Sequence, residues 1–231
     1  MDVVILCGGR GTRLQERTAD LPKPLVEIGG VPILDHVMRL YADQGLTSFL
    51  LLTGYRGELI ERHVARTGFD ARCLDTGQDT PTGGRLALAR DHVRGDRLCV
   101  TYADGLADID LAELLAFHAA HGALATMTVV RPELQFGITE LTREGRVTGF
   151  EEKPHSRDWV NGGFFVFERG VLDRLEDDSV LERGPLQALA AEGELHAFRH
   201  TGFWKCMDTY KDAVALNDLW ASGAALWRRR R

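Results

Sequence analysis

Three short apolar runs, each followed by glycine or aspartate, constrain the fold of this chain more than any other feature. They are Val3 to Cys7, Ser48 to Thr53 and Leu98 to Tyr102. Continuous apolar runs of this length are typical of strands that are buried on both faces of a parallel sheet. Between them, Ile33 to Asp43 and Leu86 to Val93 are predicted to be helical. This alternation predicts an α/β fold, with a Rossmann-like, mixed but mostly parallel sheet flanked by helices.

The second half of the chain is predicted to be α+β and to continue the same sheet. Its predicted strands are Ala125 to Val130, Ile138 to Leu141, Arg146 to Glu151, Gly163 to Phe167 and Leu195 to His200, the second and third of them forming a hairpin. Its predicted helices are Pro185 to Ala191 and Tyr210 to Ala221, and the first half ends with a predicted helix from Leu111 to Ala120 that Asp110 caps. No proline- or serine-rich linker separates the halves, so we expect a single domain.

Charge and cysteine content exclude several classes of function. The net charge of −6 makes a sequence-independent grip on nucleic acid unfavourable. The four cysteines form no CxxC pair, and Cys7 and Cys99 lie in apolar runs that predict buried free thiols. No apolar run reaches the roughly 18 residues that a membrane span needs. These features predict a reduced, cytoplasmic protein that binds neither nucleic acid nor a membrane.

A glycine-rich loop follows the first predicted strand and carries the strongest chemical signal. It reads Gly8-Gly9-Arg10-Gly11-Thr12-Arg13-Leu14, with Lys23-Pro24 further on. Glycines after a buried strand let backbone N–H groups approach an anion closely, and Arg13 and Lys23 add two cations. The spacing fits neither the P-loop, which needs GxxxxGK[ST], nor the dinucleotide fingerprint. The loop therefore predicts a phosphate site of another kind, the alternative being a glycine turn with solvated charges.

Other candidate residues have both a chemical and a structural interpretation. Asp104 follows a buried strand, where it would hold Mg²⁺ against phosphate oxygens or simply make a turn with Gly105. Asp208 would cap the final helix or supply a second metal carboxylate. Lys153 would meet a sugar phosphate or lie on an exposed hairpin edge. His118 and His121, three residues apart, indicate a partly buried helix face more than a zinc site.

Taken together, these segments resemble the sugar-phosphate nucleotidyltransferases. The family signature GGxGTRL, with a following lysine-proline, stands here as Gly8 to Leu14 and Lys23-Pro24. Within the family the chain is most similar to the cytidylyltransferase branch, which joins CTP to glucose 1-phosphate. The further matches to that branch are Glu27-Ile28-Gly29-Gly30, Asp75-Thr76-Gly77, Thr82-Gly83-Gly84-Arg85-Leu86, Asp104-Gly105, Glu152-Lys153-Pro154, Asn161-Gly162-Gly163-Phe164-Phe165 and Met207-Asp208-Thr209.

The resemblance implies an enzyme that joins a nucleoside triphosphate, preferably CTP, to a sugar 1-phosphate such as glucose 1-phosphate, with Mg²⁺ as the cofactor. It implies a single domain, with residues 1–124 as the nucleotide-binding half and residues 125–231 as the sugar-phosphate-binding half. The implied nucleotide-binding residues are Leu6, Gly8, Gly9, Gly11, Thr12, Arg13, Lys23, Thr82, Gly83 and Gly84. The implied acceptor-binding residues are Gly137, Glu152, Lys153, Asn161 and Trp204. The implied catalytic residues are Arg13, Lys23 and Asp104, and the implied metal ligands are Asp104 and Asp208.

Three departures from the family pattern accompany this resemblance. Cys7 replaces an alanine, Ala103 replaces a glycine, and the stretch between His63 and Asp75 is much shorter than in the cytidylyltransferases. The third departure leaves open whether the chain forms a homo-oligomer. Alternative acceptors are a heptose, a cyclitol phosphate, phosphocholine or a phosphonate, and a different class is a nucleotide-sugar sensor without turnover. The carboxylates Asp104 and Asp208 argue against the sensor, which has no need of a metal.

Overall fold

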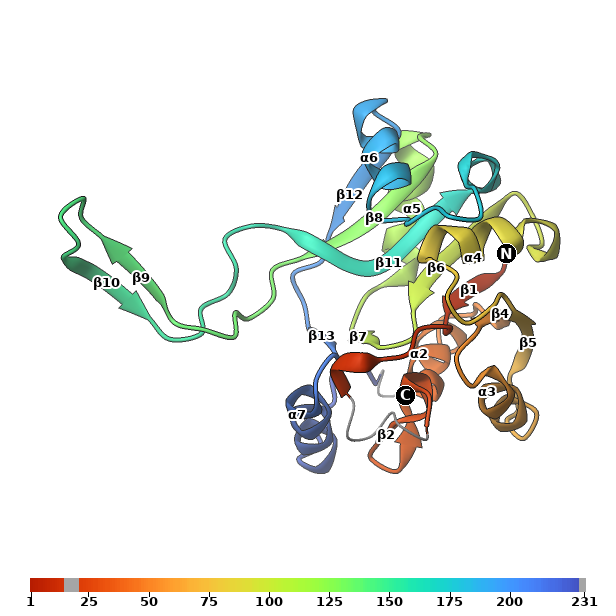
Figure 1. The fold of residues 1–231 in the computed structure, drawn as a ribbon, viewed down its shortest axis with the longest axis horizontal. Coiled ribbons are helices and arrows are strands. Elements are labelled where there is room, and N and C mark those ends of the chain that lie inside the picture. Colours follow the sequence, from red (N-terminus) through yellow and green to blue (C-terminus); the bar gives the residue numbers. More distant parts are fainter. Residues whose placement is uncertain (15–20, 229–231) are drawn as a thin grey trace.

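The central sheet of the protein combines strands from both halves of the chain (Figure 1). The computed structural model describes residues 1–14 and 21–228, except for the side chain of Arg13. Within these residues seven strands form the sheet, in the order β12 (Leu195–Arg199), β8 (Ala125–Val130), β11 (Val160–Glu168), β6 (Arg97–Tyr102), β1 (Val3–Leu6), β4 (Ser48–Thr53) and β5 (Asp70–Asp75). All neighbours are parallel except β11, which is antiparallel to both β6 and β8. The predicted mixed, mostly parallel sheet is confirmed, and the second half continues it.

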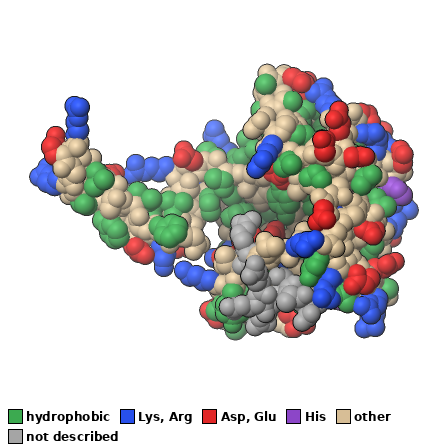
Figure 2. Space-filling view, in the orientation of Figure 1, with side chains coloured by type: hydrophobic (Ala, Val, Ile, Leu, Met, Phe, Trp, Pro, Cys, Tyr) green, Lys and Arg blue, Asp and Glu red, His purple; other side chains and the backbone are tan. Residues whose placement is uncertain are grey.

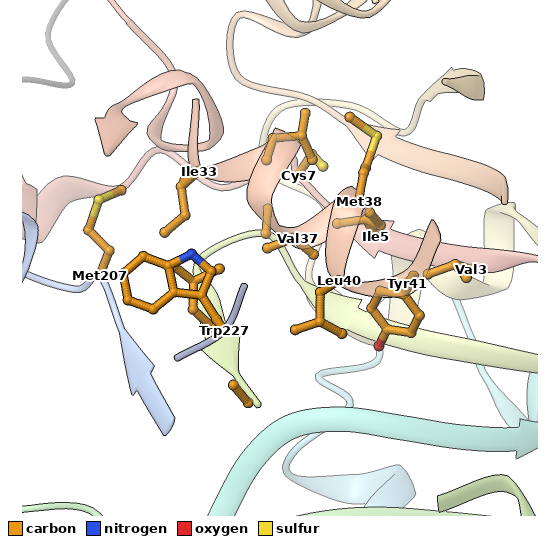
Figure 3. Close-up of a cluster of buried hydrophobic side chains, with 14 of the residues drawn as sticks. Val3, Ile5, Cys7, Ile33, Val37, Met38, Leu40, Tyr41, Met207 and Trp227 are labelled. Carbon is orange, nitrogen blue, oxygen red and sulfur yellow. The ribbon is translucent and has the colours of Figure 1, made fainter. Parts of the chain in front are cut away.

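Helices cover both faces of this sheet because alternate residues of each buried strand point to opposite sides. Val3 and Ile5 pack on one side, against α2 (Ile33–Ala42), α3 (Gly57–Val64), α5 (Leu111–His121) and α7 (Tyr210–Ala221). Figure 3 shows part of this cluster, in which side chains of α2 lie over β1. Val4 and Leu6 pack on the other side, against α4 (Thr82–Leu88), α6 (Gly184–Ala191) and the short 3-10 segment η4 (Arg169–Arg174). No helix in the described part of the chain is long and apolar enough to cross a membrane.

Among the longer elements, the sequence-based predictions agree with the structure except around α3, β5 and α4. Helix α3 and strand β5 were not predicted, because α3 is short and β5 lies at the sheet edge with half-exposed residues. Helix α4 begins at Thr82 instead of Leu86 and ends at Leu88, and the 3-10 turn η3 (Arg90–His92) follows it. The first turn of α4 contains Gly83 and Gly84, and it was not predicted to be helical because glycine is a poor helix former.

Helix capping follows one prediction and corrects another. Asp110 caps α5, as predicted, by accepting hydrogen bonds from the N–H groups of Ala112 and Glu113. The cap of α7 is Thr209, whose hydroxyl accepts from the N–H of Asp212, while the Asp212 carboxylate accepts from the N–H of Thr209. Asp208 is therefore not the helix cap, so that structural explanation for it is wrong.

Three two-stranded sheets and two further 3-10 turns lie beside the central sheet. The sheets pair β2 (Glu27–Ile28) with β3 (Val31–Pro32), β7 (Gly105–Ala107) with β13 (Trp204–Cys206), and β9 (Ile138–Leu141) with β10 (Val147–Glu151). The short strands β2, β3, β7 and β13 were not predicted. The turns are η1 (Thr12–Leu14) and η2 (Lys23–Leu25). The pair β7–β13 matters most for the site, because it joins the chain after β6 to the chain before α7.

The hairpin β9–β10 stands away from the body of the protein (Figure 1). We call residues 134–154 the arm. Apolar side chains lie on its surface, among them Phe136, Phe150 and Leu141, which are 79%, 67% and 60% exposed. Figure 2 shows hydrophobic side chains, in green, along the arm. A two-stranded hairpin has no core of its own, so these side chains stay largely exposed.

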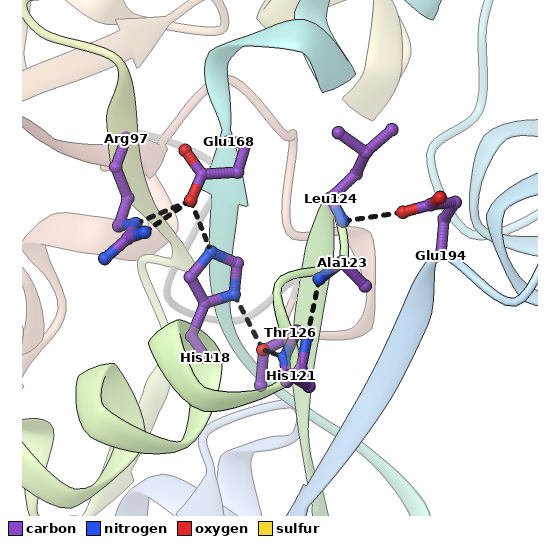
Figure 4. Close-up of polar contacts among 8 residues, drawn as sticks. All are labelled: Arg97, His118, His121, Ala123, Leu124, Thr126, Glu168 and Glu194. Carbon is purple, nitrogen blue, oxygen red and sulfur yellow. Dashed lines mark hydrogen bonds and ion pairs between the residues drawn. The ribbon is translucent and has the colours of Figure 1, made fainter.

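A polar network connects α5 to the sheet (Figure 4). His118 is buried, with Nδ1 2.8 Å from the Thr126 hydroxyl and Nε2 3.1 Å from the Glu168 carboxylate. His121 Nε2 lies 2.7 Å from the same Thr126 hydroxyl, and Arg97 donates to Glu168. Both histidines therefore have protein partners. Burial, the largest cause, lowers the pKa of each below its ordinary value.

The cysteines are free thiols, as expected from their spacing. Cys7 and Cys99 are buried, which confirms the prediction made from their apolar neighbours. Burial raises the pKa of the Cys99 thiol to about 12, so this group stays protonated at neutral pH.

Candidate active site

A cavity of about 600 Å³ opens beyond the carboxyl ends of β1 and β6. In an open α/β sheet this is where ligands bind. The predicted site residues that line it are Leu6, Gly8, Gly9, Gly11, Thr12, Lys23, Thr82, Asp104, Asn161, Trp204 and Asp208. The structure thus brings most of the predicted nucleotide, metal and acceptor residues to one place, although they come from both halves of the chain.

The glycine loop forms one wall of the cavity. Gly11 has a φ of 60°, a left-handed conformation that favours glycine. A Cβ at Gly11 would also lie 2.9 Å from the Cβ of Lys23, so the loop and the lysine stem pack directly against each other. A Cβ at Gly8 would lie 2.0 Å from Nη1 of Arg85. Gly11 is therefore required by its backbone conformation and Gly8 by the Arg85 side chain, and both residues line the cavity.

Arg85 fixes the ends of three strands beneath this loop. Its guanidinium is buried and makes five hydrogen bonds of 2.6 to 3.2 Å. The acceptors are the carbonyl oxygens of Gly8, Thr53, Gly77 and Gln78 and the hydroxyl of Thr76. These acceptors follow or end β1, β4 and β5, so one side chain sets the spacing of the loops after those strands.

Two carboxylates and a lysine meet on the opposite wall. In the β7–β13 pair Gly105 lies opposite Cys206, and the N–H of Met207 donates to the carbonyl of Asp104 over 2.9 Å. This pairing brings the Asp104 and Asp208 side chains to the same ammonium group. Lys23 Nζ lies 2.5 Å from Asp104 Oδ2 and 2.9 Å from Asp208 Oδ1. Burial alone would lower the pKa of Lys23, but the two carboxylates more than offset it, and the pKa lies above its ordinary value.

The carboxylate pair suits a magnesium ion that shares its ligands with a substrate. Within the described residues, no group of three or more His, Cys, Asp or Glu side chains forms a complete metal cage. Mg²⁺ is commonly held by only one or two carboxylates, with phosphate oxygens and waters completing its shell. Asp104 and Asp208 are both partly exposed to the cavity and already hold a cation, the Lys23 ammonium. The residues present therefore fit the metal that the resemblance implies.

Asn161 and Trp204 form the side of the cavity next to the second half of the chain. Trp204 Nε1 donates to the carbonyl of Gly162 over 2.7 Å, which fixes the plane of the indole. The Asn161 carboxamide accepts from the N–H of Gly163 and lies 3.4 Å from the hydroxyl of Tyr102. Both side chains are thus held in place, with hydrogen-bonding groups near the hollow.

Tyr102 also lines the cavity and contacts Glu182, which does not line it, and neither residue was predicted. The Tyr102 hydroxyl donates to the Glu182 carboxylate, which also accepts from the Thr82 hydroxyl at 2.7 Å. Burial, followed by the Glu182 charge, raises the pKa of Tyr102 well above its ordinary value, so the phenol stays protonated. Tyr102 was detectable, because it ends the strand that Asp104 follows. Glu182 lies far away in the sequence, and no local signal marks it.

Gly83 and Gly84 lie outside the lining of the cavity, although they were predicted to lie against the base. Both are buried against the segment before α6. A Cβ at Gly84 would lie 2.0 Å from the carbonyl oxygen of Asp177, and one at Gly83 would lie 2.8 Å from Ser179. The glycine pair therefore allows close packing of α4, while the preceding residues Gln78 to Thr82 line the cavity.

Three of the predicted acceptor residues lie on the arm and not among those lining the cavity. A Cβ at Gly137 would lie 2.6 Å from the Phe150 ring and 2.9 Å from the Glu152 carboxylate. Lys153 has a φ of 47° and a partly exposed side chain, 4.0 Å from Glu152. Arg13, the remaining predicted residue, belongs to η1, but its side chain lies outside the described part of the structure.

The fold and the cavity define a class of α/β enzymes that bind phosphorylated ligands at strand ends. A family model described as nucleotidyl transferase matches residues 2–205. The chain belongs to this family, and it is a nucleotidyltransferase.

The chain is similar in sequence to two kinds of sugar-1-phosphate nucleotidyltransferase, to different extents. The glucose-1-phosphate cytidylyltransferase of Salmonella typhimurium is 40% identical, and the alignment covers 99% of this chain and 99% of that protein. The mannose-1-phosphate guanylyltransferase of Mycobacterium tuberculosis is 32% identical, over 93% of this chain and 63% of its own length. The first alignment runs over 255 positions, more than the 231 residues of this chain, so the Salmonella protein has residues without a counterpart here. In this structure residues 65–69 alone join α3 to β5.

Solved structures confirm the fold. HddC from Yersinia pseudotuberculosis has a TM-score of 0.76 at 22% identity, covering 95% of this chain and 99% of that one. The inositol-1-phosphate CTP transferase from T. maritima has a TM-score of 0.75 at 16% identity, covering 100% of this chain and 97% of that one. At these identities the likeness concerns architecture alone.

Proposed function

We propose that this chain transfers the cytidylyl group of CTP to glucose 1-phosphate, forming CDP-glucose and pyrophosphate. The observation that carries the proposal is the 40% identity with a glucose-1-phosphate cytidylyltransferase, which extends over 99% of both chains. The guanylyltransferase match is weaker and leaves more than a third of that relative without a counterpart.

The reaction needs positioning and charge neutralisation more than a reactive side chain. An oxygen of the sugar phosphate attacks the α-phosphorus of the triphosphate in line. A new bond from that oxygen to phosphorus forms while the bond from the α-phosphorus to the β-phosphate oxygen breaks. The attacking phosphate is already anionic, so no protein nucleophile is required. The N–H groups of the loop Gly8 to Thr12, together with Lys23 and Arg13, would hold the triphosphate.

The cofactor in this proposal is Mg²⁺, held by Asp104 and Asp208. When bound, it neutralises charge on the phosphate oxygens and thereby lowers the barrier to attack. The two carboxylates would hold the ion in the cavity that the glycine loop also lines, since the β7–β13 pair brings both side chains there.

The base would be recognised by the stretch Gln78 to Thr82. This stretch lines the cavity on the side of β5, and it contains polar side chains at Gln78, Thr80 and Thr82. On the acceptor side, Asn161 and Trp204 would contact the sugar, and Glu152, Lys153 and Gly137 would approach it from the arm. Hydrogen bonds built around a base edge can discriminate by roughly 10⁴ when a wrong base leaves buried groups unpaired.

The test is kcat/KM for CTP, UTP, dTTP, ATP and GTP with glucose 1-phosphate held fixed. We expect CTP to rank first and UTP, which has the same ring size, to be its nearest competitor. A purine nucleotide or dTTP in first place would overturn the base assignment and leave the reaction class standing. A panel of phosphorylated acceptors with CTP then tests glucose 1-phosphate in the same way.

We also infer that the chain forms a homo-oligomer through its arm. The exposed Phe136, Leu141 and Phe150 support this, because a contiguous apolar surface on a projecting hairpin is unfavourable in water. Light scattering after size exclusion should give a mass above that of one 25.7 kDa chain. The double variant F136S/F150S should shift the protein to monomer, and a wild-type monomer would contradict the inference.

A further inference from the structure

Lys23 occupies the oxygens that a metal ion would need. Its ammonium lies 2.5 Å from Asp104 Oδ2 and 2.9 Å from Asp208 Oδ1, and its side chain is only 13% exposed. An ammonium in this position neutralises much of the charge that would attract a divalent cation. It also repels any cation that approaches the same oxygens. Lys23 and Mg²⁺ therefore compete for these two oxygens.

We propose that Lys23 is a built-in competitor of the metal: without nucleotide it holds the carboxylate pair, and the triphosphate draws it away so that Mg²⁺ can bind. The inference rests on the proposed function, in which the pair is the metal site. The nucleotide-free enzyme then has no strong Mg²⁺ site, and metal affinity appears only together with the triphosphate.

The packing of Lys23 allows this exchange without a change of fold. Its stem lies against Gly11 in the phosphate loop, so a phosphate bound to the loop comes within reach of the same side chain. A lysine ammonium is a point charge on a flexible four-carbon stem, and it can rotate from carboxylates to phosphates. In both states a cation faces the two negative charges of the carboxylate pair. That cation is the singly charged ammonium without nucleotide and the doubly charged Mg²⁺ once the lysine has moved to the phosphates.

The test measures binding of Mn²⁺, a spectroscopic substitute for Mg²⁺, by electron paramagnetic resonance of the free ion. Four samples are compared: wild type alone, wild type with the non-hydrolysable α,β-methylene analogue of CTP, Lys23→Met alone and Lys205→Met alone. Lys205 is a matched control, because it lies on β13 between the cavity-lining residues Trp204 and Cys206 but does not line the cavity. Its removal changes the net charge equally without freeing the pair.

We expect Lys23→Met to bind Mn²⁺ at least tenfold more tightly than wild type in the absence of nucleotide. Lys205→Met should stay within about twofold of wild type, since a charge outside the cavity is largely screened. With the analogue, the wild type should remove more Mn²⁺ from solution than the analogue removes alone, which is tight binding in the complex. Adding Asp104→Asn to Lys23→Met should abolish the gain, which places the ion on the carboxylate pair. If Lys23→Met fails to fold, Lys23→Gln, which lacks the charge but keeps a donor, carries the same expectation.

The possible failures separate the two proposals. Equal Mn²⁺ affinity of wild type and Lys23→Met, with tight binding in the nucleotide complex, overturns the competition and leaves the proposed function intact. Tight Mn²⁺ binding by the wild type without nucleotide also overturns the competition. Absence of Mn²⁺ binding in every sample overturns the competition and the metal assignment together.

Discussion

Arg85 should contribute more to stability than any single residue that touches the ligand, and Arg85→Met tests this. Methionine keeps most of the apolar stem but none of the five hydrogen bonds. The carbonyl of Gly8 keeps another donor, the N–H of Tyr55, and that of Thr53 keeps the N–H of Thr76. Among the described residues, no other donor replaces Arg85 at the carbonyls of Gly77 and Gln78.

The expected loss follows from the five hydrogen bonds. Gly77 and Gln78 are exposed, so water can reach their carbonyls, and each lost hydrogen bond costs its net value of roughly 0.5 to 1.5 kcal/mol. The desolvation of a buried cation is relieved at the same time, which offsets part of the loss. We therefore expect Arg85→Met to lower the free energy of unfolding by about 3 kcal/mol. Arg85→Lys keeps the charge but cannot reach all acceptors at once. Its free energy of unfolding should lie between those of Arg85→Met and the wild type.

Urea unfolding followed by circular dichroism measures this change through the midpoint and the slope of the transition. Arg62→Met is the control, because Arg62 is exposed on α3 and, within the part of the chain that the structure describes, its side chain donates only to the carbonyl of Glu58. It should change the free energy of unfolding by less than about 0.5 kcal/mol. A loss below about 1 kcal/mol in Arg85→Met would show that the five hydrogen bonds add little net stability, and the reasoning would be refuted.

Three further predictions concern pH, the acceptor and the loop. The free energy of unfolding should fall as the pH drops below about 6.5, because the folded state holds the pKa of His118 and His121 below that value and the unfolded chain takes up protons first. Denaturation at several pH values measures this, His118→Gln should flatten the profile, and an increase toward acid would contradict it. Lys153→Ala should raise KM for the sugar 1-phosphate several-fold while calorimetry shows near-normal NTP binding; equal damage to both would show that the role is misplaced. Arg13→Ala should lower kcat far more than it raises KM for NTP, and a change in KM alone would indicate ground-state binding only.

The strands and helices that could be predicted are those whose local sequence shows how they are buried or where they begin. β1, β4 and β6 are continuous apolar runs, and α5 begins at a residue that caps it. β5 was not predictable in this way, since its residues are only half-buried. The first turn of α4 contains two glycines because another segment packs against it, and this is a property of the tertiary structure and not of the helix.

The same distinction applies to the site. Gly11 and Asp104 could be identified locally, from a loop and a strand end. The meeting of Asp104 with Asp208 depends on the pairing of β7 with β13, two strands of three residues each, which no local pattern predicts. Arg85 was visible as a residue, but its burial beneath three strand ends was not.

The pairing of β7 with β13 also sets the order in which the enzyme becomes competent. β13 follows every strand of the central sheet in the chain, so a polypeptide still being synthesised can assemble the phosphate loop and Asp104 before Asp208 exists. Contacts between such distant segments form late, because the entropy cost of closing a long loop must be met before the contacts can stabilise the chain. Catalytic activity should therefore return after the sheet during refolding, and it reports the final closing step. A chain that ends before β13 would keep the phosphate loop but lack half of its carboxylate pair.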